Sequence, residues 1–476
     1  MHAVLYRNSI VRHRLQDVGL ALFSLVCVAL AIWLIIKGQG RAAVAMALMI
    51  CFVVLAVQHP LQALFILLIY LTFLADIRRL LIYILPWSGK DPLLLIGPAA
   101  AGFLVLGALL KRRIQLDTPL ARIMTMLMLV MFIQIFNPLQ GGLTVGVAGA
   151  LFYIAPLLWF WVGRTYLSEV FMARVFRLLA VLALLVVAVG FYQAIWEYLP
   201  HQKAWIEAGG GYSALLVGDR YRPISVFSSS AEYVQFLTIG GVIYLAYFLI
   251  YRQGIALLGY SLMIAGILLA GTRSPLVLLA FATAVMWAVR GSHFASWTVR
   301  LLGGLALVGL FLTLLLSQLE HLPLPEQVRP MIERQVSGLS DPLNEETSTA
   351  PDHIMMVIDG FRQGFTRPWG KGLGATTLAA SRFGDGGAST EQDFSDMFVA
   401  LGLVGGTLYL LVILYIFRNA ITYWHQQRSL ISLGILGIAV TTFGLWLAGS
   451  HYAASAIIWL SFGFLDRAQQ LSAEGI

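Results

Sequence analysis

The sequence predicts an all-α integral membrane protein with about fourteen transmembrane helices, within a range of twelve to fourteen. Hydrophobic residues make up 59% of the chain, charged residues make up 11%, and the mean hydropathy is +0.83. Soluble domains carry roughly 45–50% apolar and about 25% charged residues. Apolar runs of about 20 residues recur along the chain, and each is long enough to cross a bilayer as a helix. Because these runs do not alternate polar and apolar residues, helices are favoured over a β-barrel.

The spans follow one another along a single membrane domain, residues 1–476. The first apolar run comes after a basic tail, but it is too long for a signal peptide and has no small-residue cleavage pattern. The predicted spans are 17–36, 42–57, 61–75, 92–110, 120–136, 145–162, 178–195, 231–250, 255–271, 274–289, 301–318, 394–417, 429–448 and 451–465.

The distribution of basic residues favours a topology with both termini in the cytoplasm. The cytoplasmic loops then contain Lys111 to Arg113, Arg164 to Arg177, Arg252, Arg290, Arg300, Arg418 and Arg428. The same rule explains the net charge of +8 without a nucleic-acid partner. A re-entrant or interfacial segment around Ile77 to Trp87 would account for some of the basic residues that this topology places outside, which are Lys37, Arg41, Arg78, Arg79 and Lys90.

Two polar segments fall on the outer side, a first loop at residues 197–230 and a large loop at residues 319–393. In the large loop, apolar side chains recur at helical spacing, which predicts an amphipathic helix on the bilayer surface or on the bundle. These side chains belong to Ile354, Ile358, Phe361 and Phe365. A turn follows, Pro368 to Gly374, whose glycines permit backbone conformations that other residues avoid.

Arg273 lies in a short polar break between two apolar runs, Leu269 to Pro275. An arginine at this depth is costly unless it is paired or faces a water-filled cavity. One interpretation is a side chain that extends from a helix end to the membrane surface. The other is an anion-binding guanidinium, whose planar fork suits bidentate contact with a phosphate.

A second basic segment precedes the span at 231–250. Arg220 and Arg222 lie at this membrane mouth, where arginines bind lipid headgroups or an anionic substrate, and Arg222 is the closer to the span. Glu232 begins the apolar run, so it is either a partner of the helix dipole or a buried acid.

A cluster of acids marks the return of the large loop to the membrane, at Glu391, Asp393 and Asp396. Acids at the start of a helix suit the helix dipole without any catalysis. The functional interpretation is a general base for an incoming hydroxyl group. His321 and His353 lie in the same loop, but neither has a second ligand at metal-binding spacing, so we expect no metal site.

Three stretches together resemble the O-antigen polymerase and O-antigen ligase family of polytopic membrane glycosyltransferases. They are Arg222 with Phe227 to Glu232, then Leu269 to Pro275, then Phe361 to Gly374. The resemblance covers roughly residues 220–415. The chain departs from the ligases where they carry a histidine and an asparagine before a span, because it has Glu391 and Gln392 there. This departure favours the polymerases.

The resemblance implies a GT-C-like fold and metal-independent glycosyl transfer at the periplasmic face, with no cofactor. The implied partners are a polyprenyl-diphosphate-linked glycan donor, a glycan acceptor, the lipid bilayer and other polysaccharide assembly proteins. On this basis the expected catalytic residues are Arg222, Arg273, Glu391 and Asp393. The expected substrate-binding residues are Arg220, Glu232, Arg362, Arg367 and Lys371.

Three alternatives stay open at this point. An O-antigen ligase would transfer the glycan to a lipid or protein acceptor. A polysaccharide transporter or flippase would also have many spans and a charged cavity, although transporters often show two similar halves and this sequence shows no repeat. A non-catalytic assembly partner would keep the fold without the activity.

Overall fold

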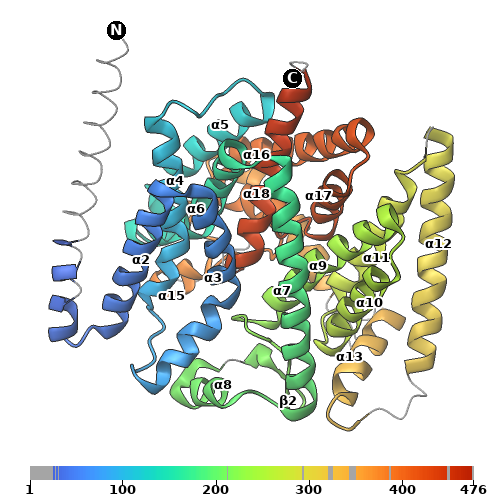
Figure 1. Cartoon of the computed structure of the whole chain (residues 1–476), viewed down its shortest axis with the longest axis horizontal. Helices are drawn as coiled ribbons and strands as arrows, with labels where there is room; N and C mark the ends of the chain where they lie inside the picture. The colour runs from blue at the N-terminus through green and yellow to red at the C-terminus, as the bar shows by residue number, and fades with distance from the viewer. Residues whose placement is uncertain are drawn as a thin grey trace.

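The structure, a computed structural model, describes residues 25–26, 28–30, 32–211, 213–291, 294–319, 325–341, 350–384, 387–447 and 451–473. Within these residues the protein is a helical bundle, and its single sheet is one antiparallel pair of two-residue strands, β1 (Leu216–Val217) and β2 (Arg220–Tyr221) (Figure 1). Seven described helices are long and apolar enough to cross a membrane. The chain is therefore an all-α membrane protein.

A helix coincides with each predicted span from 42–57 onward, and half of the first predicted span, 17–36, lies outside the described residues. The bundle helices are α2 (Gly40–Gln58), α3 (Pro60–Leu80), α4 (Ile96–Leu110), α5 (Pro119–Gln134), α6 (Leu143–Tyr166), α7 (Glu169–Trp196), α9 (Ser230–Tyr251), α10 (Gly254–Leu269), α11 (Arg273–Ala288), α12 (Phe294–Leu319), α16 (Asp393–Gln427), α17 (Leu430–Thr441) and α18 (Tyr452–Ala473). Several are shorter than a full span, including α5, α10, α11 and α17.

Several boundaries differ from the prediction, since α7 begins at Glu169 and α16 continues to Gln427, well beyond the predicted 178–195 and 394–417. The predicted span 429–448 ends early, because α17 stops at Thr441. The expected re-entrant segment around Ile77 is instead a continuation of α3 to Leu80, followed by a short 3-10 turn, Leu81–Tyr83. Hydropathy could not predict where α3 ends, because its last turn contains two arginines that are nevertheless buried in the protein.

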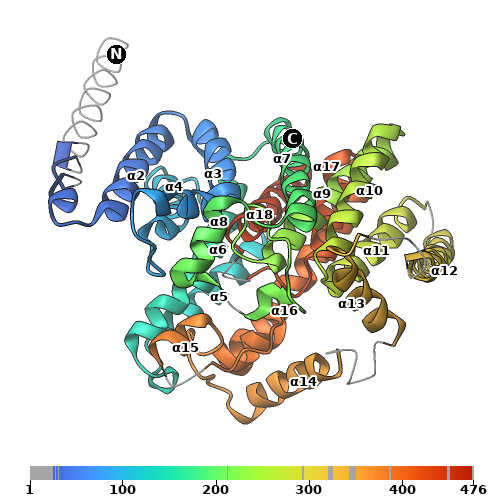
Figure 2. The same ribbon diagram turned by 90° about the horizontal axis from the view of Figure 1, so that it is seen from below.

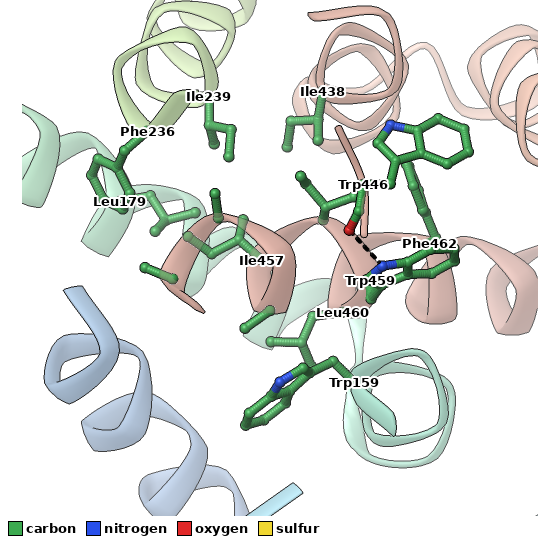
Figure 3. Packing of buried hydrophobic residues seen from close by; sticks show 14 of the residues in the cluster. Trp159, Leu179, Phe236, Ile239, Ile438, Trp446, Ile457, Trp459, Leu460 and Phe462 are labelled. Carbon is green, nitrogen blue, oxygen red and sulfur yellow. Dashed lines mark hydrogen bonds between the residues drawn. The ribbon is translucent and has the colours of Figure 1, made fainter. Parts of the chain in front are cut away.

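The centre of the bundle is α18, although it is not among the seven long apolar helices. Figure 3 shows its side chains Ile457, Trp459, Leu460 and Phe462 among residues of α6, α7, α9 and α17. The indole of Trp459 donates to the carbonyl oxygen of Trp446 at 2.8 Å. A helix enclosed by other helices does not need a lipid-facing surface, which explains why hydropathy alone ranks it low.

Three of the basic residues that the predicted topology placed outside, Arg41, Arg78 and Arg79, have partners inside the fold. Asp91 accepts from Arg41 at 2.5 Å and from Arg78 at 3.2 Å, and its side chain is fully buried. The guanidinium of Arg79 stacks on the ring of Trp205 at 4.1 Å. These contacts hold the arginines in place inside the fold, whichever side of the membrane they face.

A second buried ion cluster joins three helices at the other side of the bundle. Arg164 of α6 pairs with Asp466 of α18 at 2.7 Å and also contacts Asp117. Thr118, the residue before α5, donates to the same Asp466 oxygen at 2.7 Å. Both clusters pair arginine with aspartate across distant segments of the chain.

The first loop and the early part of the large loop cover one end of the bundle, which we call the loop end. Here lie α8 (Pro200–Trp205), the β1–β2 pair and α13 (Arg329–Ser340) (Figures 1 and 2). The first loop forms a small core of its own, made of Tyr198, Trp205, Leu215 and Ile224. It is therefore a folded cap and not an extended linker.

The large loop also contains α14 (Ala350–Thr366) and α15 (Leu378–Phe383), so the predicted amphipathic helix is confirmed. Phe361 of α14 packs on Phe394 and Phe398 of α16. Ile354 and Ile358 remain 52% exposed. The helix thus lies on the bundle through one face and keeps apolar side chains exposed on another.

Candidate functional site

The turn between α10 and α11 is where two predicted catalytic arginines meet. Residues 270–272 separate the helices, and Gly271 has a positive φ of 66°. The last carbonyl groups of a helix need donors from elsewhere, above all in a membrane. Arg222 supplies one donor, from Nε to the carbonyl oxygen of Ala270 at 3.0 Å, and its Nη2 contacts Oγ1 of Thr272.

Gln335 of α13 holds the same turn from the other side. Its amide nitrogen donates to the carbonyl oxygens of Ile267 at 3.3 Å and Thr272 at 3.1 Å. Gln335 is fully buried on the face of α13 that also carries Met331, Ile332 and Val336. The signal for Gln335 in the sequence is a polar residue within this apolar stripe, and the sequence reasoning missed it.

Arg273 opens α11 and reaches along α13. Its Nε and Nη2 donate to the carbonyl oxygen of Arg334 at 3.1 and 2.7 Å. Among the described residues Arg273 forms no ion pair, and Arg334 adds a second positive charge within electrostatic range. We call Arg222, Thr272, Arg273 and Arg334 the arginine node. Its Arg273 is held in position by one backbone carbonyl group, which orients the guanidinium without neutralising it.

A polar pocket of about 290 Å³ lies beside the node. The hydroxyl of Tyr198 donates to the carbonyl oxygen of Arg222 at 2.7 Å, so the pocket wall and the node are joined directly. Tyr198 stacks on Tyr221, with ring centroids 5.2 Å apart. The charged residues that line the pocket are Glu197, Lys203, Glu207, Asp219 and Arg220.

Arg220, a predicted substrate-binding residue, is therefore in this pocket. It pairs with Glu197 at 3.5 Å, and Glu197 pairs with Lys203 at 2.9 Å. The hydrogen bond and charge of Lys203, with the charge of Arg220, hold the pKa of the Glu197 carboxyl below its usual range. Since carboxylates, basic groups and tyrosine rings all line the pocket, it suits a ligand with many hydroxyl groups.

Glu232 lies away from the arginine node, buried in the first turn of α9. One of its oxygens accepts from the backbone N–H of Ser228 at 3.3 Å and from the Ser228 hydroxyl at 2.7 Å. It lines a small internal void with Arg78 and Tyr452. Both interpretations from the sequence fit this position, since Glu232 is buried and also lies in the first turn of α9.

The two acids predicted as general bases are in different environments. Glu391 is exposed, with a positive φ of 62°, and pairs with Nδ1 of His353 at 3.1 Å. Asp393 is buried, accepts from the backbone N–H of Leu447 at 2.7 Å, and contacts the hydroxyl of Tyr409 at 3.4 Å. Asp393 therefore connects α16 to the segment before α18, whereas Glu391 remains accessible.

The third acid of the cluster, Asp396, caps the loop in front of α16. Its carboxylate accepts from the backbone N–H of Thr390 at 2.6 Å and from the hydroxyl of Ser389 at 3.1 Å. This geometry matches the interpretation that acids here stabilise the start of a helix. The Glu391–His353 pair is the accessible part of the cluster.

The glycine-rich turn closes a break inside α16. The helix is interrupted at Gly402, where φ is 69° and ψ is −161°, a conformation essentially restricted to glycine. The backbone N–H of Leu403 donates to the carbonyl oxygen of Pro368 at 3.0 Å, and Lys371 N–H donates to Val399 at 2.9 Å. The turn thus satisfies backbone groups that the break leaves open.

The remaining predicted substrate-binding residues follow α14 and this turn. Arg362 is exposed on α14, and Arg367 is exposed directly after it. Burial and the charge of Arg367 lower the pKa of Lys371. The structure thus forms two groups, Arg220, Arg222 and Arg273 at the loop end, and Glu391 with Arg362, Arg367 and Lys371 along α14 and α16.

No protein-family model matches the chain, and no curated protein matches it in sequence. The resemblance to the O-antigen polymerases and ligases consequently depends on the motifs themselves.

Proposed function

We propose that the protein is a membrane glycosyltransferase that polymerises polyprenyl-diphosphate-linked oligosaccharide units into a surface polysaccharide or exopolysaccharide. One observation carries the proposal: Arg222 contacts Thr272, 50 residues away in the sequence, and so lies beside Arg273 at one turn. In this proposal the loop end faces the periplasm of a bacterial inner membrane, and both termini are cytoplasmic. The arginine node binds the donor diphosphate there.

The reaction needs positive charge at the leaving group. An acceptor hydroxyl oxygen attacks the anomeric carbon of the donor, the bond from that carbon to the diphosphate oxygen breaks, and the diphosphate keeps the electron pair. Fixed guanidinium groups stabilise the negative charge that develops on it. Arg273 suits this role because two hydrogen bonds to the Arg334 carbonyl oxygen already fix its orientation, so little reorganisation accompanies the reaction.

The polar pocket supports the sugar side of the proposal. Arg220 is two residues from Arg222 in the chain, and Tyr198 connects the pocket to the Arg222 backbone. A sugar presents hydroxyl groups at its edge and an apolar face, which fit the charged rim and the ring of Tyr221 respectively. A saccharide attached to a diphosphate at the node thus has a binding surface next to it.

The proton of the acceptor hydroxyl goes to Glu391 in this proposal. Its carboxylate is accessible, whereas Asp393 is buried and its Oδ2 accepts from the Leu447 backbone N–H and from the Tyr409 hydroxyl. Arg362, Arg367 and Lys371 would hold the growing chain near this base. Glu232, which is buried against Ser228, would instead position the segment before α9.

A second candidate is an O-antigen ligase, which one observation favours. The ligases use a histidine near this position, and the large loop supplies His353 beside Glu391. In a ligase the pair would activate a hydroxyl group of a lipid or protein acceptor.

The direct test is incubation of the purified protein with a polyprenyl-diphosphate-linked repeat unit, without ATP and with a metal chelator. We expect longer chains on the polyprenyl carrier. Arg273→Ala should abolish them while the protein still inserts into membranes. Arg290→Ala, at the opposite end of α11, serves as the control and should keep them.

Three outcomes contradict the polymerase. Wild-type chain lengths from Arg273→Ala would remove the arginine from the mechanism. Transfer only to an added lipid or protein acceptor would identify a ligase. Movement of the unit across a vesicle membrane without elongation would identify a transporter.

A further inference from the structure

An apolar groove of about 380 Å³ lies on the outside of the bundle at α10, α11 and α12. The floor is α11, with Leu276 and Ala280, and the walls carry Ile264 of α10 and Leu307 and Phe311 of α12. Leu307 and Phe311 are more than half exposed, so the groove opens to the membrane.

The hydroxyl groups in this groove are already satisfied. Tyr260 and Thr283 bond to each other at 2.7 Å, and Thr283 donates to the carbonyl oxygen of Leu279 at 2.7 Å. Ser261 donates to the carbonyl oxygen of Leu257 at 3.1 Å. A polar occupant would find few free hydrogen-bonding groups, whereas a hydrocarbon chain loses none by binding here.

The floor helix of the groove, α11, is also the helix that begins with Arg273 of the arginine node. Ala280 follows Arg273 by seven residues, which is about two helical turns, so both lie on the same face of α11. Leu276 lies between them, near this face. The floor of the groove, from Leu276 to Thr283, therefore begins about 5 Å along the helix from Arg273 and continues for about 10 Å.

The node end of the groove is covered by α13. This helix packs on α10, α11 and α12, and its residues Met331, Ile332 and Val336 are buried. Its Arg334 carbonyl group holds the guanidinium of Arg273. One end of the site is thus cationic and the rest is apolar, which fits an amphiphile with a small, strongly anionic headgroup.

We propose that this groove binds the isoprenoid tail of the donor, with the diphosphate at the arginine node and the first isoprene units along α11. The inference rests on the proposed function, since that function supplies the donor. The groove would be a second recognition element beside the arginine node, because a soluble diphosphate without a tail would bind the node alone.

The test is equilibrium binding of radiolabelled undecaprenyl diphosphate to the purified full-length protein in nanodiscs. Ala280→Trp fills the floor of the groove, and we expect it to weaken binding by about tenfold or more, since buried apolar area is lost. Val277→Trp places the same side chain at an exposed position of α11 outside the groove. This control should bind as the wild type does.

Inorganic diphosphate, used as a competitor, isolates the headgroup. It should displace the tail-bearing ligand equally from the wild type and from Val277→Trp, and its own affinity should be unchanged in Ala280→Trp. If Ala280→Trp bound undecaprenyl diphosphate with wild-type affinity, the assignment of the groove to the isoprenoid tail would be overturned. The proposed function would stand in that case if Arg273→Gln still lost binding. Failure of the wild type to bind undecaprenyl diphosphate would instead overturn the proposed function.

A photoreactive analogue of undecaprenyl diphosphate tests the groove in the wild-type protein, so the result does not depend on whether Ala280→Trp folds. A diazirine in the second isoprene unit should label the wild-type segments Leu257–Ile264 and Leu307–Phe311. Labelling confined to other helices would contradict the inference. Equal displacement of the analogue by phosphatidylglycerol would assign the groove to phospholipid acyl chains and would also contradict it.

Discussion

The two buried ion clusters and the arginine node use the same side chain in opposite ways. Arg41 and Arg78 share Asp91, and Arg164 is matched by Asp466 and Asp117, so their charges are compensated inside the fold. Arg273 is bound by a carbonyl oxygen and has another arginine beside it. The difference indicates which arginines hold helices together and which are available to an anion from outside.

The largest expected effect is at the compensated arginines. Asp91→Asn keeps the shape of the side chain but removes the charge that two buried guanidinium groups share. We expect a loss of about 3–5 kcal/mol in the free energy of unfolding, because uncompensated buried charge is costly. Chemical unfolding in detergent measures it.

Asp117→Asn is the matched control, since the Asp117 carboxylate is 35% exposed and Arg164 keeps Asp466. The loss in the free energy of unfolding should be clearly smaller for Asp117→Asn than for Asp91→Asn. Equal stability of Asp91→Asn and the wild type would break the comparison.

The same contrast applies to the two acids before α16. Asp393→Asn should lower the free energy of unfolding by about 1–3 kcal/mol, because the buried carboxylate accepts from Leu447. Glu391→Gln should leave stability nearly unchanged and lower the rate of elongation by about 10²-fold or more, as loss of a general base does.

Rates and unfolding curves of both variants should be measured side by side. If Asp393→Asn kept its stability and lost the activity while Glu391→Gln remained active, the roles of the two acids would be reversed.

A smaller change tests the orientation of Arg273 without altering any charge. A methyl group at Gly338 of α13 would overlap the Arg273 guanidinium, which would have to shift. Alanine is also the better helix former by roughly 1 kcal/mol. Gly338→Ala should therefore fold as well as the wild type and bind undecaprenyl diphosphate several-fold more weakly.

Gly303→Ala is the control for that variant, since nothing lies within 4 Å of the added methyl group. Undiminished binding by Gly338→Ala would show that the position of the guanidinium is unimportant.

The smallest effect concerns the polar pocket. The pKa of Glu197 is lowered in the folded protein, so its ion pairs add stability above the pKa of the unfolded state. That stability is lost as pH falls through the lowered value. Because the pairs are exposed, we expect the unfolding midpoint to fall by less than about 2 °C on acidification. Glu197→Gln should remove this pH dependence. A wild-type midpoint that rose on acidification would have the wrong sign.

Hydropathy predicted the positions of the helices, and the polar break at Leu269 to Pro275 drew attention to Arg273. Hydropathy could not predict how the helices pack, so the central position of α18 and the burial of its Asp466 appeared only in the structure. Arg164 and Asp466 are 302 residues apart in the sequence, and no local pattern links them. The Glu391–His353 pair was missed for the same reason.

The most direct test of the account is the stabilisation of the protein by undecaprenyl diphosphate, read as the shift in its thermal unfolding midpoint. The account predicts that the ligand raises the midpoint of the wild type and of Arg290→Gln. Arg273→Gln should unfold within a few degrees of the wild type without ligand and show no shift with it. A full ligand-induced shift in Arg273→Gln would contradict the assignment of the arginine node to the diphosphate.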